Sequence, residues 1–236
     1  MSGFCHSLWA IVVKDVVAEF RSRQVLPTMI VLGMLIVWVM RIVSEATVLS
    51  SRVMAPAGLW IAFLFCGLLV QERSFAVEEK QDCIAALLLA PIDAGTIYLA
   101  KLLVNVFILC VFEIIIVPIV LLAFGIGVPG RWPTLVAVLL LGNVAISSVG
   151  TIFSAMVQLS HARGALLSIL VLVILLPIMV PAIFALLVLF EAVPPEQAGT
   201  GILAMVGSLS NAVGYMTAFD ALFTTVCWLL FGFVVQ

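Results

Sequence analysis

The stretch ERSFAVEEKQDCIAALLLAP, residues 72–91, is the densest charged segment of a chain that is otherwise strongly apolar. Six charged residues lie between Glu72 and Asp82, and the apolar block 84–90 follows them before Pro91. Long apolar runs flank this segment on both sides, whereas its own charges require water. A segment that is polar at one end and apolar at the other suits a short helix lying against a membrane surface. We therefore predict that residues 72–91 form a contact surface just outside the membrane.

The composition excludes a soluble domain. The 236 residues are 65% hydrophobic and only 9% charged, and a soluble protein has no means of hiding so much apolar surface from water. The expected fold class is an all-α polytopic membrane protein with one transmembrane domain over residues 1–236. No basic stripe indicates a nucleic-acid partner. The five cysteines are scattered without CxxC spacing, which is typical of small apolar or surface residues rather than of a metal site or a disulfide framework.

Six apolar runs are long enough to cross a membrane, for which about 20 residues are needed. The predicted spans are about 25–44, 53–71, 94–124, 132–159, 165–190 and 212–235. Residues 198–211 are apolar but rich in Gly and Ser, and they fit either an interfacial turn or an extension of the sixth span. Residues 4–24 place apolar side chains at spacings of three and four among charges, which predicts an interfacial helix that leads into the membrane.

The distribution of basic residues predicts the orientation of the spans, because cytoplasmic segments carry more Lys and Arg than outer ones. With the N-terminus in the cytoplasm, seven basic residues lie inside and three outside. The inner set is Lys14, Arg21, Arg23, Arg73, Lys80, Lys101 and Arg163, and the outer set is Arg41, Arg52 and Arg131. Both termini and the segment 72–91 are then cytoplasmic. Lys101 is expected near the cytoplasmic end of the third span, with its ammonium group reaching the interface.

Two acids fall within predicted spans, Glu113 in the third and Asp220 in the sixth. A carboxylate in hydrocarbon is unfavourable, so such groups usually face a protein interior or a cavity. For Glu113, a gating or conduit role and a buried packing contact are equally favoured, whereas for Asp220 the packing contact is favoured. Two histidines, His6 and His161, make a metal site improbable. His161 is a weak candidate for a haem ligand and fits a polar loop residue better.

Glycines in the fourth span and prolines in the third and fifth spans predict features of helix packing. Gly142 and Gly150 flank a group of small polar residues, and small residues allow two helices to approach closely. Pro118, Pro177 and Pro181 remove backbone hydrogen bonds and predict kinks or flexible points.

Three stretches resemble one family, the CcmB family of haem exporter B subunits, within the wider class of ABC-2 type exporters. The loop stretch consists of Glu72-Arg73-x-Phe75, Leu87-Leu88-Leu89-x-Pro91 and Leu99-Ala100-Lys101. The other two are Arg163-Gly164-x-Leu166-Leu167-Ser168-Ile169-Leu170 with Pro177 after it, and Phe219-Asp220-x-Leu222-Phe223 leading to Phe231-x-Phe233-Val234. The family pattern usually has a Gly near 82, an acid near 85 and a Pro near 173, where this chain has Asp82, Ala85 and Val173.

The resemblance implies a subunit of the bacterial inner membrane that works in cytochrome c maturation. It would couple ATP hydrolysis by a separate subunit to haem export or to release of the haem-loaded periplasmic chaperone. A separate cytoplasmic ABC ATPase would dock on the loop, since the chain itself has no GxxxxGK[ST] motif for ATP. The implied ATPase-coupling residues are Glu72, Arg73, Phe75, Glu78, Glu79, Asp82, Leu87, Leu88 and Pro91. Further implied partners are a haem-handling membrane subunit, a periplasmic haem chaperone, membrane lipids and a second copy of the chain. ATP would be bound by the partner, and haem would be cargo of the complex rather than a cofactor of this chain.

Two other functions remain open at this point. The first is an ABC-2 type exporter permease for a lipid, a polysaccharide or a drug. The second is a membrane-embedded enzyme that uses Glu113 and Asp220 as acid and base, which requires the two carboxyl groups to share one cavity. No nucleophile or metal site accompanies the two acids in the sequence.

Overall fold

The computed structural model describes residues 2–22, 24–47, 50–74, 93–127, 130–160, 164–192 and 206–235. Within these ranges the chain is helical apart from short turns, and no strand is present. The helices are α1 (Ser2–Ser22), α2 (Val25–Ala46), α3 (Ser51–Ser74), α6 (Ala94–Phe124), α7 (Trp132–Ser160), α8 (Gly164–Leu189) and α9 (Leu209–Val235). All except α1 are long and apolar enough to cross a membrane. The prediction of an all-α polytopic membrane protein with six spans is confirmed.

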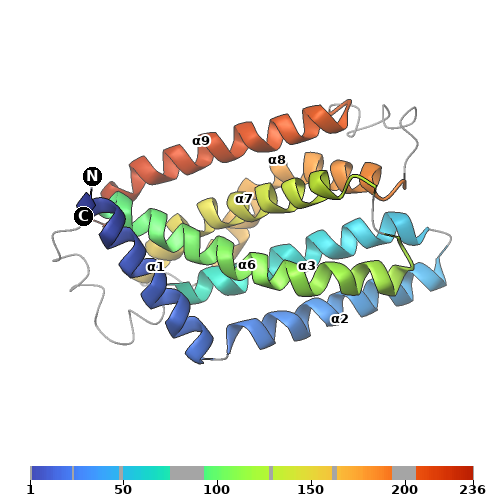
Figure 1. Cartoon of the computed structure of the whole chain (residues 1–236), viewed down its shortest axis with the longest axis horizontal. Coiled ribbons are helices and arrows are strands. Elements are labelled where there is room, and N and C mark those ends of the chain that lie inside the picture. The colour runs from blue at the N-terminus through green and yellow to red at the C-terminus, as the bar shows by residue number, and fades with distance from the viewer. Residues whose placement is uncertain are drawn as a thin grey trace.

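The six spanning helices lie side by side along the long axis of the molecule, and α1 lies obliquely across one end (Figure 1). At this end α3 finishes and α6 begins, so we call it the loop end, after residues 75–92 that connect them. α1 starts and α9 finishes at the loop end too, as an even number of spans requires (Figure 1). The opposite end is called the far end.

The predicted spans agree with the observed helices to within about three residues, and the third agrees at both ends. The alternative left open for residues 198–211 is resolved in part. α9 begins at Leu209, after a turn at residues 206–208, so the last three residues of the stretch extend the sixth span. Residues 198–205 lie outside the described part of the chain. Pro118, Pro177 and Pro181 all lie inside helices that continue past them.

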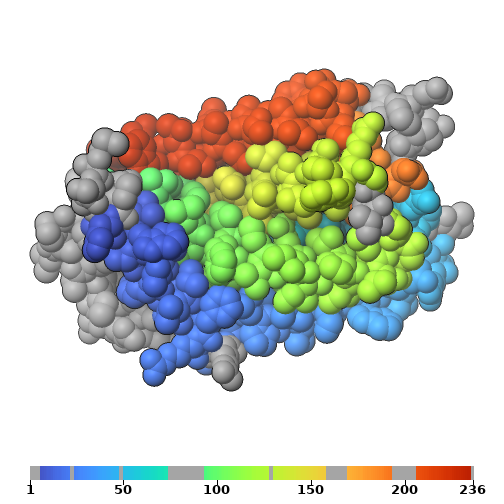
Figure 2. Space-filling view, in the orientation of Figure 1, coloured from blue at the N-terminus to red at the C-terminus, as the bar shows by residue number. Residues whose placement is uncertain are grey.

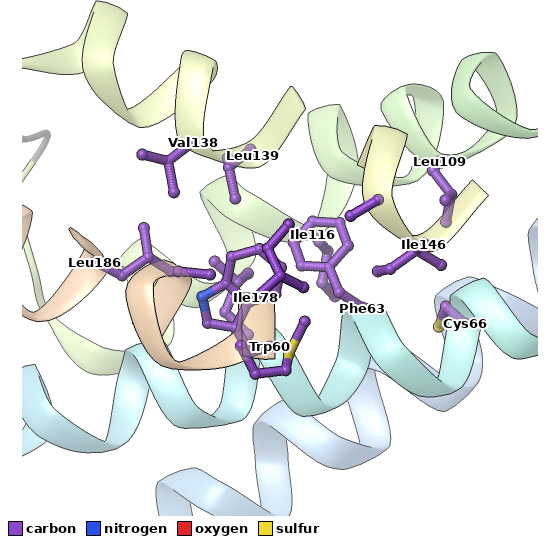
Figure 3. Close-up of a cluster of buried hydrophobic side chains, with 14 of the residues drawn as sticks. Trp60, Phe63, Cys66, Leu109, Ile116, Val138, Leu139, Ile146, Ile178 and Leu186 are labelled. Carbon is purple, nitrogen blue, oxygen red and sulfur yellow. The ribbon is translucent and has the colours of Figure 1, made fainter. Parts of the chain in front are cut away.

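The centre of the bundle is α7, which contacts α3, α6, α8 and α9. Large apolar side chains from α3, α6 and α8 pack against it. They include Trp60 and Phe63 from α3, Ile116 from α6 and Ile178 from α8 (Figure 3). The Phe63 ring meets Phe112 edge-on at a centroid distance of 5.7 Å. In the space-filling view, α6, α7 and α9 cover one face of the bundle in that order (Figure 2).

The outer surface of the spans is apolar. The exposed large side chains include Val31, Leu35, Trp38 and Ile42 on α2, Ile169, Val173 and Leu176 on α8, and Leu222, Leu229 and Phe233 on α9. Such a continuous apolar surface is unstable in water and matches the hydrocarbon of a bilayer. The packing therefore supports the membrane assignment independently of helix length.

α1 carries an apolar stripe that faces away from the protein. Trp9, Val13, Val17 and Phe20 recur at helical spacing and are all exposed, whereas Ile11 on the opposite side is buried. A helix with an apolar stripe open to its surroundings and charges beside it suits the interface between lipid headgroups and acyl chains. This arrangement agrees with the interfacial helix predicted for residues 4–24.

Basic side chains of the described residues lie near the two ends of the spans. At the far end, Arg52 on α3 pairs with Glu191 after α8 at 2.9 Å, and Arg41 pairs with Glu45 at 2.8 Å. Arg73 and Lys101 lie at the loop end. These residues divide between the two ends as the count of basic residues predicts.

Two glycines allow α3 and α7 to pack closely, as the sequence predicts. A Cβ atom on Gly142 would overlap the indole ring of Trp60, and one on Gly150 would overlap the side chain of Gln71. The two α3 side chains therefore occupy the space that any larger residue on α7 would need.

We predict that Gly142→Val destabilises the protein, because the fully buried Trp60 has no free space into which to move. Overpacking of this kind typically costs about 1–3 kcal/mol. The matched control is Gly214→Val on α9, where an added Cβ meets no atom within 4 Å. The measurement is the thermal unfolding of both variants in detergent. Equal stability of the two variants would contradict the close packing of α3 on α7.

Candidate functional site

The predicted coupling segment begins at the end of α3, where Glu72 and Arg73 are exposed to solvent. The Arg73 guanidinium donates a hydrogen bond to the Gln24 side-chain oxygen at 3.0 Å. Gln24 directly precedes α2, so the end of the second span is tied to the start of the first. The remaining predicted coupling residues lie outside the described part of the chain: Phe75, Glu78, Glu79, Asp82, Leu87, Leu88 and Pro91.

Lys101 lies on the first part of α6 and is buried rather than exposed at the interface. Its ammonium group pairs with the Asp15 carboxylate of α1 at 2.9 Å, and only 5% and 12% of the two side chains are exposed. The prediction that Lys101 reaches out to the membrane interface is wrong. Because α1 packs over the loop end of α6, it supplies the carboxylate that neutralises the buried ammonium group.

One turn further along α6, a cluster of polar side chains lies buried between three helices. The Asn105 amide donates to the Gln71 side-chain oxygen at 2.9 Å and to the Thr151 hydroxyl at 3.0 Å. The Ser154 hydroxyl donates to the Gln71 backbone carbonyl at 2.5 Å. We call Gln71, Asn105, Thr151 and Ser154 the polar seam. It joins α3, α6 and α7 by hydrogen bonds in a region that is closed to water.

Glu113 lies deeper in the bundle and is also buried. The Asn143 amide of α7 donates to the thiol sulfur of Cys110, three residues before Glu113 on α6, at 3.6 Å, which places Asn143 beside the Glu113 carboxyl group. The Glu113 Oε1 atom and the Asn143 Oδ1 atom have no hydrogen-bonding partner. The sequence placed Glu113 correctly within a span, but only the structure identifies Asn143 as its neighbour.

Asp220 on α9 is buried as well, and neither of its carboxyl oxygens has a hydrogen-bonding partner. No hydrogen bond or ion pair joins it to Glu113. The structure therefore gives no support to the membrane-embedded enzyme, which needs the two carboxyl groups to act together.

The described residues contain no group of three or more His, Cys, Asp or Glu side chains that would hold a metal ion. His6 is exposed on α1, and His161 lies outside the described residues.

Residues 6–225 match the model of the family described as CcmB protein, which covers nearly the whole chain. The chain belongs to the CcmB family. The resemblance stated from the three sequence stretches is thereby confirmed. The comparison with curated proteins found no match.

Family membership makes this CcmB chain a membrane component of the haem exporter of cytochrome c maturation. CcmB is the permease subunit of an ABC transporter, so the chain works in a complex with an ATPase and other components of the maturation system. This assignment favours the haem exporter over the general ABC-2 permease for a lipid, a polysaccharide or a drug.

The polar seam is the part of this CcmB chain that sequence reasoning missed. A signal exists in α7, where Asn143, Ser147 and Thr151 recur at intervals of four residues and so lie on one face. Small polar residues in a span are also common in plain helix packing, and the small polar residues between Gly142 and Gly150 were interpreted only in that way. Asn105 and Gln71 have no such pattern, because each is the only amide in its own span.

We predict that Asp15→Asn destabilises the CcmB chain by about 3–5 kcal/mol, because it leaves the Lys101 ammonium group buried without a counter-charge. The double variant Asp15→Asn with Lys101→Met should recover much of this loss. Lys14→Met is the matched control, since Lys14 also contacts Asp15 but is 56% exposed. The measurement is thermal unfolding in detergent for the full set. A double variant no more stable than Asp15→Asn alone would contradict the role of the buried pair.

Proposed function

We propose that this chain couples ATP hydrolysis by a separate cytoplasmic ABC ATPase to release of the haem-loaded periplasmic chaperone during cytochrome c maturation. In this proposal the ATPase docks on residues 72–91, and the chain lies in the bacterial inner membrane with both termini in the cytoplasm. The observation that carries the proposal is the hydrogen bond between Gln71 and Asn105. It acts as a clamp between α3 and α6, the two helices that the docking loop connects.

Because this hydrogen bond holds α3 and α6 together, a force on the loop moves both helices and does not bend their ends apart. Gln71 lies four residues before the first residue of the connection 75–92, and Asn105 lies in the fourth turn of α6. The clamp is buried, and breaking it would leave polar groups unpaired in a region without water. Displacement of the loop therefore moves α3 and α6 together.

Two further contacts extend this movement to neighbouring helices. The hydrogen bond from Arg73 to Gln24 links α3 to the start of α2, and the ion pair of Lys101 with Asp15 links α6 to α1. All three contacts lie at the loop end. A push on the loop is thus passed to α1, α2, α3 and α6 as a rigid-body shift, which is a common form of switching in transporters.

The orientation is supported by the basic residues at the loop end, since cytoplasmic segments are enriched in Lys and Arg. The far end, with the Arg52–Glu191 pair, then faces the periplasm, where the haem chaperone works. A haem-handling membrane subunit and either a second copy of this chain or a different subunit complete the assembly. Haem is the cargo of this assembly, and ATP is bound only by the ATPase.

The docking role of the loop predicts that the triple variant Glu78→Lys, Glu79→Lys and Asp82→Lys weakens ATPase binding by about tenfold or more. Reversed charges on one side of a complementary surface replace attraction with repulsion. The measurement is the amount of ATPase subunit that co-purifies with the tagged chain in mild detergent.

The matched control is Glu45→Lys, a charge reversal of an exposed acid at the far end, which should leave ATPase binding unchanged. If the triple variant retained the ATPase as well as the control does, docking on residues 72–91 would be wrong. Thermal stability of both variants, measured in the same preparations, separates lost docking from lost folding.

A further inference from the structure

Glu113 lies close to the middle of its span, 19 residues after Ala94 and 11 residues before Phe124. At 1.5 Å per residue it is about 12 Å beyond Asn105, toward the far end. A carboxyl group at this depth is unfavourable unless it has partners, and such groups usually mark ion or proton sites.

The contact between Glu113 and Asn143 contains acceptors that lack a donor. The Oε1 atom of Glu113 and the Oδ1 atom of Asn143 are both buried without a hydrogen-bonding partner. An ionised carboxyl group and an amide oxygen only accept hydrogen bonds. One proton on the carboxyl group changes it into a donor, and it can then donate to the amide oxygen of Asn143.

A row of polar side chains runs along α7 from this contact to the loop end. Asn143, Ser147 and Thr151 follow one another at intervals of one turn, about 6 Å apart along the helix axis. The Ser147 hydroxyl is fully buried and has no hydrogen-bonding partner. Thr151 is joined through Asn105 to Gln71, which lies at the loop end of α3.

Toward the far end, the corresponding interior is apolar. Beyond Glu113, the buried side chains of α6 are Ile116, Val120 and Phe124, and those of α7 before Asn143 include Leu135 and Leu139. Among the described residues of α6 and α7, buried polar side chains therefore lie between Glu113 and the loop end, and none lies between Glu113 and the far end.

We propose that Glu113, with Asn143, is an intramembrane proton-binding site that exchanges protons with the loop end along Ser147 and Thr151. The site takes up a proton on the Glu113 carboxylate and releases it toward the same end. Protonation strengthens the α6–α7 contact, because it supplies the donor that the two oxygens lack. This inference goes beyond the docking and coupling role proposed above and takes from it only the orientation, with the loop end in the cytoplasm.

Few other ionisable groups surround Glu113. On α6 itself, Cys110 is near enough to interact with its charge. On α2, Gly33 lies against Phe112 and Ile116, and on α3, Phe63 lies against Phe112, so both helices present uncharged residues to this part of α6. The charged residues of α2 and α3 lie near the helix ends, and those of α1 lie over the loop end, with Asp15 on Lys101. α9 contributes Asp220, which has no hydrogen bond to Glu113.

The test uses dicyclohexylcarbodiimide, an apolar reagent that partitions into the bilayer and reacts with protonated carboxyl groups. The carboxyl O–H adds across one C=N bond of the reagent, and the product rearranges to a stable acylurea that mass spectrometry locates. The native complex is labelled in inside-out and right-side-out membrane vesicles, with a pH difference maintained across the membrane.

We expect an adduct at Glu113 whose yield falls several-fold when the pH is raised on the side of the loop end. Raising the pH on the far side should leave the yield unchanged. Absence of an adduct at Glu113 at every pH would overturn the proposal, and so would a yield that follows the pH on the far side.

Three variants sharpen the result. Glu113→Gln should lose this adduct, whereas Asp220→Asn should keep it, together with its dependence on the pH at the loop end. The double variant Ser147→Ala with Thr151→Val removes the hydroxyl groups of the row and leaves the carboxyl group in place. It should slow the response to a pH change at the loop end several-fold, and an unchanged response would show that the protons do not use this row.

Discussion

The hydrogen bonds of Asn105 to Gln71 and Thr151 are the constraint on which the rest of the structure depends. Between transmembrane helices the hydrophobic effect gives little preference for one packing over another, because lipid tails are as apolar as the side chains. Polar groups in the interior do distinguish between packings, since an unpaired amide there has no water to bind. The polar seam therefore fixes how α3, α6 and α7 lie relative to one another.

The same constraint explains why the loop end is suited to receive a mechanical input. The chain leaves the bundle after α3 and re-enters it at α6, and the seam holds these two helices together close to both points. The Asp15–Lys101 pair adds α1 to the same rigid unit, and α1 places its exposed apolar stripe at the membrane surface. The membrane surface and the helix bundle then limit the directions in which the loop end can move. This is the end at which we propose that the ATPase docks.

Most of the fold could be predicted from the sequence, because each segment that crosses a bilayer must by itself be long and apolar enough to do so. Length and apolar character alone located six spans, and the third, with Asp93 before it and Gly125 after it, was bounded correctly at both ends.

Contacts between segments were not accessible in the same way. Lys101 was expected to reach the interface because it lies near the end of its span. Its partner Asp15 lies on a helix 86 residues earlier in the chain, and nothing in the sequence pairs the two. The partner of Glu113 was missed for the same reason: the spacing of Asn143, Ser147 and Thr151 places them on one face of α7, but it does not tell which helix that face meets.

This CcmB-family chain is a membrane component of the haem exporter of cytochrome c maturation and works together with an ABC ATPase. The most direct test is to purify the tagged chain from native membranes in mild detergent and identify the proteins that accompany it by mass spectrometry. We expect to recover a small ABC ATPase together with a Trp-rich haem-handling membrane protein. An ATPase without any haem-handling partner would contradict the role in cytochrome c maturation, and recovery of neither would contradict the transporter as well.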